Sequence, residues 1–176
     1  TVDGVSPEYA AVRNVSIDTG SFISDSNVTG LSKVAVLGPT TMTDLFGESA
    51  TADETIGQQI RIKGIVFTVI GITVSKGGSG FTNQDDMIYI PVTSAERYFA
   101  GDSYLTSIDI QAVDGADMTT IENDATTLLI AKHHISDAAN ADFSILNQAD
   151  IISTASSLTG PFTLILTAVA GLSLIV

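Results

Sequence analysis

Few side chains in this sequence could carry out chemistry, and its two histidines are the first to consider. His133 and His134 are the only histidines in the chain. Adjacent residues lie about 100° apart around a helix. The pair therefore cannot chelate one metal ion from a single helix face, as residues four apart can. Because positive charge is favourable at the C-terminal end of a helix, we expect these histidines to cap a helix rather than to bind metal or catalyse a reaction.

A short acidic run offers a second possible site. Asp85 and Asp86, together with Asn83, could contribute oxygen ligands to a calcium ion. The run lacks the Asp-x-Asp-x-Asp-Gly alternation of a calcium loop. The sequence therefore favours solvated loop charges at this place and predicts no metal site.

Signatures of catalysis and of phosphate binding are missing from the sequence. It contains no Gly-x-Ser-x-Gly elbow of the kind that exposes a serine nucleophile. The run Gly77-Gly-Ser-Gly80 has no Lys-Ser/Thr after it and no clear helix, so it does not match a phosphate-binding loop. With no cysteine, there is neither a thiolate nucleophile nor a cysteine-based zinc site. We predict no enzyme, no catalytic residues and no cofactor. The sequence does not identify any substrate-binding residues, which stay unknown.

Two triplets match the acceptor sequence for N-glycosylation. They are Asn14-Val-Ser16 and Asn27-Val-Thr29. They matter only in a host that glycosylates, where they would agree with a location outside the cytoplasm.

Length and charge limit the classes of function. The 176 residues suffice for one domain or two small lobes. Twenty acidic and seven basic residues give a net charge of −13, so binding to a phosphate backbone would work against the field of the protein. Nucleic acid is thereby excluded as a partner. A mean hydropathy of +0.35 is high for so acidic a chain, which indicates that apolar residues are concentrated in one region.

That region is the C-terminal end. No charged residue follows Asp150, and residues 161–176 are apolar on every helical face. As a helix these residues would span about 24 Å, slightly less than the ~30 Å of a bilayer core. We predict that residues 151–176 comprise a membrane-proximal stretch and the start of a transmembrane helix. The alternatives are a buried C-terminal helix of a soluble core and an aggregation-prone tail.

The charges before this stretch indicate its orientation. The nearest basic residue upstream is Lys132, and the charged residues between it and the apolar run are Asp137, Asp142 and Asp150. Because basic residues close to a membrane span mark the cytoplasmic side, residues 1–150 are expected at the cell membrane on its extracytoplasmic side.

Several local patterns predict elements in the first two thirds of the chain. Residues 33–37 read as a strand that leads into a helix over 40–46, with Pro39 suited to its first turn and Gly47 to its end. Alternating apolar residues in 58–63 and 65–74 predict a hairpin about Lys63-Gly64. The second arm is rich in β-branched residues and should lie centrally in a sheet.

Further patterns predict an α+β fold. Residues 75–86 read as a polar loop, 87–91 as a strand ended by proline, and 13–17 as a partner strand. Thr93-Ser-Ala-Glu96 fits a capping box at the start of a helix. Residues 105–113 and 142–146 read as strands on either side of a helix opened by Asp117, which predicts a β-α-β unit over 105–146.

The order of these motifs resembles the extracytoplasmic core domain of MacB-type, FtsX-like ABC transporter permeases. In order, the motifs are Val34-Ala-Val-Leu-Gly38, Leu45-Phe-Gly47, the hairpin segment from Thr55 to Ile72, and Asp85-Asp-Met-Ile-Tyr-Ile-Pro91. Two departures from the family pattern are small. Glu54-Thr55 stands where the family often has Asp-Pro. Asp86, the second aspartate of the last motif, lies one residue closer to Pro91 than the family pattern has it.

The resemblance implies an α+β fold in two lobes. Residues 1–32 and 102–150 would form a discontinuous porter-like lobe, residues 33–101 an inserted Sabre-like lobe, and residues 151–176 the membrane segment. It also implies mechanical coupling of cytoplasmic ATP hydrolysis to movement of the outer domains, for export or extraction. The implied partners are an ABC ATP-binding subunit or domain, a second permease copy, the membrane, and an extracytoplasmic protein. ATPase activity is not implied, because the chain has no Walker motif.

Two other classes of protein stay open. A membrane-anchored surface module, such as an adhesin or a sensor domain, would share the acidic exterior and the apolar end. The sequence that follows would separate it from a permease, which needs further apolar spans. The hydrolase hypothesis is disfavoured because the sequence shows no arrangement of a nucleophile and a base. Measured turnover of esters or glycosides would revive this hypothesis.

Overall fold

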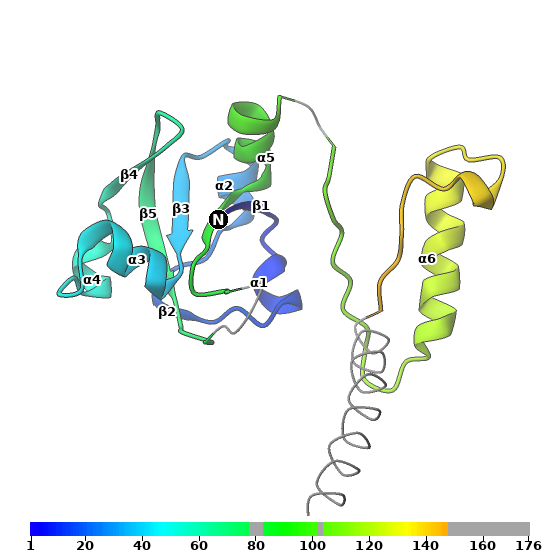
Figure 1. Cartoon of the computed structure of the whole chain (residues 1–176), viewed down its shortest axis with the longest axis horizontal. Helices are drawn as coiled ribbons and strands as arrows, with labels where there is room; N and C mark the ends of the chain where they lie inside the picture. Colours follow the sequence, from blue (N-terminus) through cyan, green and yellow to red (C-terminus); the bar gives the residue numbers. More distant parts are fainter. Residues whose placement is uncertain (78–82, 102–103, 148–176) are drawn as a thin grey trace, which may run out of the picture. The chain divides into compact units, whose positions relative to one another are not determined.

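The computed structural model describes residues 1–77, 83–101 and 104–147 (Figure 1). The chain divides into two compact units, Thr1–Gln111 and Ala112–Val176. The first contains a mixed six-stranded sheet with helices, and the described part of the second contains one long helix. The predicted α+β class is therefore confirmed.

The sheet of the first unit mixes parallel and antiparallel strands. Its order is β1-β6-β3-β5-β2, and β4 also pairs with β5. Strand β1 runs parallel to β6, and β3 runs parallel to β5, while the remaining pairs are antiparallel. Residues 1–32 contribute β1 and β2, so they share this sheet with residues 33–101. The bounds are β1 Val2–Val5, β2 Ile17–Gly20, β3 Val34–Leu37, β4 Gln59–Ile62, β5 Ile65–Thr73 and β6 Ile88–Pro91.

The predicted hairpin and its central arm are confirmed. Strands β4 and β5 pair from Gln59↔Thr68 to Ile62↔Ile65. The two turn residues, Lys63 and Gly64, have φ of 46° and 89°, as a two-residue turn between antiparallel strands requires. Strand β5 hydrogen-bonds with β2, β3 and β4, which explains why its side chains are so apolar.

The predicted passage from strand to helix after residue 37 is also confirmed. Helix α3 covers Pro39–Phe46 with proline at its first position, and its C-cap is Gly47. The amides of Thr40 and Thr41 donate to the backbone carbonyl of Asp85 at 3.0 and 3.3 Å. A carbonyl from another loop thus satisfies amides that the first helical turn leaves unpaired. Gly38 permits this approach, because a Cβ there would collide with that carbonyl.

Helix α5, Val92–Ala95, and the π-helix η1, Glu96–Ala100, follow β6 directly. The predicted capping box from Thr93 to Glu96 is wrong. Helix α5 begins at Val92, and the Thr93 hydroxyl donates to the carbonyl of Val28 at 2.6 Å. The hydroxyl is engaged by α2, Asp25–Thr29, so a tertiary acceptor has replaced the local one. A capping box does form between Thr51 and Glu54, at the start of α4, Ala52–Thr55.

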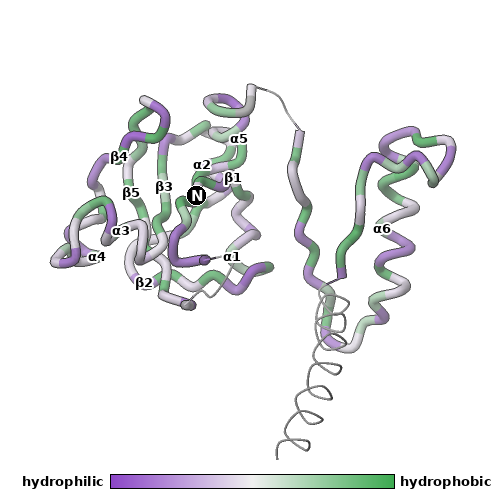
Figure 2. The backbone as a smooth tube through the Cα atoms, viewed as in Figure 1, coloured by the Kyte–Doolittle hydropathy of each residue, from purple (hydrophilic) through white to green (hydrophobic). Residues whose placement is uncertain are grey.

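Both faces of the sheet are covered. Successive residues of β3 point to opposite faces, so Ala35 and Leu37 pack in one buried cluster and Val36 in another. The first cluster is flanked by side chains of α3, α4, α5 and η1. The second is flanked by Tyr9 of α1, Tyr9–Val12, and by Val28 of α2. Figure 2 shows the hydropathy of β3 and of the strands beside it.

The β-α-β unit predicted over 105–146 is only partly correct. Helix α6, Met118–Lys132, is present, and the Asp117 carboxylate accepts the Thr119 amide at 3.1 Å as its N-cap. Residues 105–113 and 142–146 have the apolar alternation of strands but are not paired, so neither is a strand. Their apolar side chains are exposed, among them Ile110 at 65% and Leu146 at 80%. Alternation describes a side-chain pattern, whereas a strand also requires a hydrogen-bonding partner.

The strand predicted at 13–17 is misplaced. Strand β2 begins at Ile17 and runs to Gly20, while a turn after α1 takes up residues 13–14. Asn14 adopts a left-handed φ of 53°, which breaks any extended segment there. A short 3-10 helix, η2 at Ala138–Asn140, completes the described elements.

Candidate functional site

The two histidines lie where the sequence placed them, at the C-terminal end of a helix. His133 is the C-cap residue of α6, and His134 follows with a left-handed φ of 55°. The Nδ1 atom of His133 lies 2.9 Å from Asp142 Oδ1, and the His133 ring packs edge-on against Phe143. These contacts tie the segment after α6 to the end of the helix.

Asp85 organises the loop between β5 and β6. Its carboxylate accepts the Ser75 hydroxyl at 2.6 Å and the amides of Lys76 and Gly77 at 2.9 and 3.1 Å. Only 8% of its surface is exposed. These hydrogen bonds, that from Ser75 foremost, lower the pKa of Asp85 below its ordinary value of 3.8. With its carboxylate already engaged by the protein, Asp85 serves the structure of the loop.

The other members of the acidic run are also engaged by neighbours. Asn83 accepts the amide of Asp85 at 3.0 Å, and Asp86 accepts the Thr41 hydroxyl at 3.2 Å. Within the described ranges, no three His, Asp or Glu side chains are grouped so that they could hold a metal ion. The glycine run after Lys76 lies largely outside the described residues.

The two glycosylation triplets occupy different surroundings. Asn14 is exposed in the turn after α1. Asn27 is half-buried in α2, where its side-chain oxygen accepts the Ser24 amide at 3.0 Å. Asn14 is therefore the more accessible acceptor of the two.

An aromatic and charged cluster covers one face of the sheet near β1. Tyr89 is buried with the rings of Tyr9 and Phe22 at 5.5 and 5.8 Å, and burial raises its pKa to about 12. Burial, followed by the nearby Asp109 carboxylate, raises the pKa of Asp3. Arg13 pairs with Asp109 at 3.6 Å. The phenol stays protonated at neutral pH, and its ring packs against Tyr9 and Phe22 on this face.

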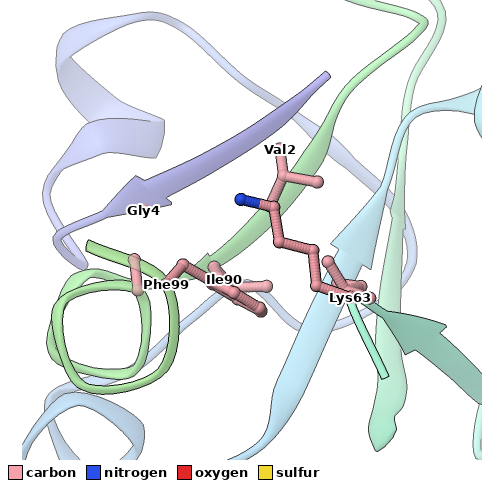
Figure 3. Close-up of a pocket in the computed structure, with 7 residues that line it drawn as sticks. Val2, Gly4, Lys63, Ile90 and Phe99 are labelled. Atoms are coloured by element: carbon pink, nitrogen blue, oxygen red, sulfur yellow. The ribbon is translucent and has the colours of Figure 1, made fainter. Parts of the chain in front are cut away.

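The opposite face of the sheet carries a pocket of about 260 Å³. Four separate segments form it: β1, the β4–β5 turn, β6, and the helical segment α5–η1 (Figure 3). Gly4 is required there, because a Cβ on it would collide with that of Ala95. Its lining residues are Val2, Gly4, Ile62, Lys63, Ile90, Ala95 and Phe99.

Lys63 is the charged residue of this pocket. Its ammonium nitrogen lies 5.8 Å from the centre of the Phe99 ring, within the range of a cation–π contact. Figure 3 shows the side chain reaching from the hairpin back over the pocket, toward Val2 and β1. Sequence reasoning missed this site, because its residues come from four places in the chain and form no motif.

Among the residues that the structure describes, no helix is long and apolar enough to cross a membrane. The predicted membrane segment, 151–176, lies outside the described residues.

The chain is similar to known transporter proteins over almost its whole length. A family model described as the MacB-like periplasmic core domain matches residues 1–128. A macrolide export ATP-binding/permease protein MacB from Bdellovibrio bacteriovorus is 33% identical over 176 residues, which are 99% of this chain and 26% of that protein. Its counterpart from Chlorobium luteolum is 34% identical and covers 97% of this chain and 25% of its own length. The chain thus spans about a quarter of these relatives.

Two solved structures share the fold. The periplasmic region of MacB from Actinobacillus actinomycetemcomitans has a TM-score of 0.70 at 21% identity, and the match covers 88% of this chain and 64% of that one. The extracellular domain of YknZ, a noncanonic ABC-type transporter from Gram-positive bacteria, has a TM-score of 0.58 at 16% identity and covers 78% and 66%. The family match confirms the resemblance predicted from the motifs and the extracytoplasmic location, and the chain belongs to the MacB-like periplasmic core domain family.

Proposed function

We propose that this chain is the outer domain of an ABC transporter permease and couples ATP hydrolysis in the cytoplasm to movement outside the membrane. The observation that carries the proposal is the 33% identity, over 99% of the chain, to a macrolide export ATP-binding/permease protein. The chain would do no chemistry of its own. The ATPase would belong to a separate domain or subunit, and a second permease copy would complete the machine.

The packing of the first unit suits a mechanical role. Its sheet is covered on both faces, and Leu37, Phe67 and Ile90 at its centre have no exposed surface. Closely packed interiors deform little and transmit strain. Such a unit would move as a rigid body when a membrane helix attached to it moves, which is the requirement for hinge-type domain motion.

The division into lobes is likewise a proposal. Residues 1–32 and 102–150 would form the porter-like lobe, and residues 33–101 the Sabre-like lobe. The boundary of the first compact unit at Gln111 supports a change of lobe soon after residue 101. The membership of residues 1–32 is the part to test, since β1 and β2 pair inside the sheet. Hydrogen exchange would show whether these strands open together with β3 and β5 or together with α6.

The coupling can be tested with spin labels in the full-length permease. With any cysteines elsewhere in the permease replaced, a cysteine placed at the exposed position Asp18 or Glu48 of this cysteine-free chain gives one label per copy. We expect the distance between labels on the two copies to differ between the nucleotide-free and the ATP-bound transporter. An ATPase variant that cannot bind ATP serves as the control and should show one distance throughout. Equal distances in both states of the active transporter would contradict mechanical coupling.

A further inference from the structure

We propose that the pocket beside β1 binds the apolar tail of a small amphiphile that carries one negative charge, with Lys63 as its counter-charge. This site would be separate from the mechanical coupling proposed above. Failure of the ligand proposal would therefore leave the permease proposal standing.

The walls of the pocket favour an apolar group. Ile90 forms a fully buried part of the lining, and Ile62, Ala95 and Phe99 add further apolar surface. The volume of about 260 Å³ lies just below the roughly 300–1,000 Å³ of typical small-molecule sites. It can take a short hydrocarbon chain, but it is too small for a large ring. An apolar tail placed there would remove its own surface, and the part of the lining that is still exposed, from water, which is favourable.

The positive charge of Lys63 at the entrance of the pocket favours an anionic head group. No carboxylate forms a salt bridge with Lys63 in the described part of the chain. Its ammonium group rests on Phe99 instead, and Lys33 rests in the same way on the neighbouring Tyr98, at 5.0 Å. A cation held against an aromatic ring keeps its positive charge available to an anion on its other side.

The charge distribution of the chain points the same way. Its net charge is −13, and two of its seven basic residues, Lys63 and Arg97, lie in the segments that form this pocket. Asp3, on β1, belongs to the cluster on the other face of the sheet, and Glu96 is the acidic residue of η1. The net charge of the chain would repel an anion in general, and Lys63 supplies a local positive charge at this pocket.

Each half of the ligand uses one half of the site. An uncharged hydrocarbon would leave the ammonium group of Lys63 unpaired, and a bare inorganic anion would leave the apolar walls wet. A positively charged amphiphile would be repelled. The geometry therefore favours a tail with an anionic head over these three alternatives.

Photolabelling can test this site in the full chain held in lipid nanodiscs. The probe is an eight-carbon carboxylate with a diazirine at the end of its tail, and mass spectrometry maps the labelled peptides. We expect labels on β1, β6 and the α5–η1 segment. Octanoate should compete with the probe. Octylammonium should compete less well, and octan-1-ol should compete up to about fivefold less well, the largest ratio that one partly exposed ion pair supplies. Labels spread evenly over the chain, or equal competition by octan-1-ol, would overturn the proposal.

Matched variants separate the two halves of the site. Lys63→Gln should reduce labelling of the pocket about fivefold. Arg61→Gln, two residues away in a separate groove with Gln59 and Val66, should leave it unchanged. Val2→Trp, at a side chain 41% exposed on the rim, should block the pocket. Thermal unfolding checks that each variant remains folded. Equal labelling of the Lys63→Gln and Arg61→Gln proteins would refute the role of Lys63.

Discussion

Asp85 shows how much of a loop one carboxylate can organise. Its side chain accepts hydrogen bonds from Ser75, Lys76 and Gly77, while its backbone carbonyl caps α3. A sequence motif of two aspartates suggests ion binding, yet the hydrogen bonds of Asp85 are made within the protein. The residue thus connects the end of β5 with the start of α3, and it should matter for stability.

Replacing Asp85 with asparagine should lower the free energy of unfolding by about 2 kcal/mol at neutral pH, because charge-assisted hydrogen bonds to three donors become neutral or are lost. Urea unfolding measures the change. Asp86→Asn is the matched control, since Asp86 is exposed and accepts one hydroxyl. The Asp86→Asn substitution should lower the free energy of unfolding clearly less than Asp85→Asn does. Equal stability of the Asp85→Asn protein and the wild type would contradict the structural role.

The same pair of proteins should show a defined dependence on pH. Folding lowers the pKa of Asp85 below 3.8, so the folded state favours the charged carboxylate. The stability gained in this way is present above about pH 4 and is lost as the pH falls through the lower folded pKa. The difference in unfolding free energy between wild type and Asp85→Asn should therefore shrink below about pH 4. If the difference in unfolding free energy between the two proteins grows on acidification, the predicted direction of the pH dependence is wrong.

At the scale of elements, local chemistry and tertiary contacts decide different things. The β4–β5 hairpin follows from its alternation and from a turn that needs two positive φ angles. The start of the helix after β6 cannot be predicted from the local sequence in the same way. Thr51-Ala-Asp-Glu54 and Thr93-Ser-Ala-Glu96 have the same capping-box spacing, yet only the first forms the box. The hydroxyl of Thr93 instead binds the carbonyl of Val28, which local sequence cannot reveal.

Gly64→Ala should destabilise the hairpin by roughly 1 kcal/mol, because the left-handed φ of 89° is unfavourable for a residue with a Cβ. No atom lies within 4 Å of a Cβ placed there, so the cost is conformational alone. Thermal or urea unfolding measures it. Lys63→Asn is the matched change in the same turn and should be neutral or slightly stabilising, since asparagine tolerates this region. A Gly64→Ala protein as stable as the wild type would contradict the turn geometry.

At the scale of the whole molecule, the first compact unit holds all the buried apolar residues that form the two core clusters. They extend from Val5 to Ile90. Among the described residues, the core of this unit is therefore built from side chains within residues 1–111.

Deletion of residues 158–176 should leave a soluble, folded protein with an unfolding midpoint close to that of the full chain in lipid. Circular dichroism and urea unfolding measure this. A variant that also lacks β1, residues 1–5, is the comparison and should unfold, because it removes the parallel partner of β6. If deletion of residues 158–176 alone unfolds the sheet, the apolar end belongs to a soluble core.

The sequence by itself determined the elements whose signals are local, namely β3 with α3, the β4–β5 hairpin, β6 and α6, and the order of motifs that marks the family. Tertiary structure decided the rest. Strand β1 pairs with β6 more than 80 residues away, residues 105–113 lack a strand partner, and the pocket at Lys63 joins four segments. The physical reason is that periodicity and turn chemistry act over a few residues, whereas pairing and cavity formation depend on which distant segments meet.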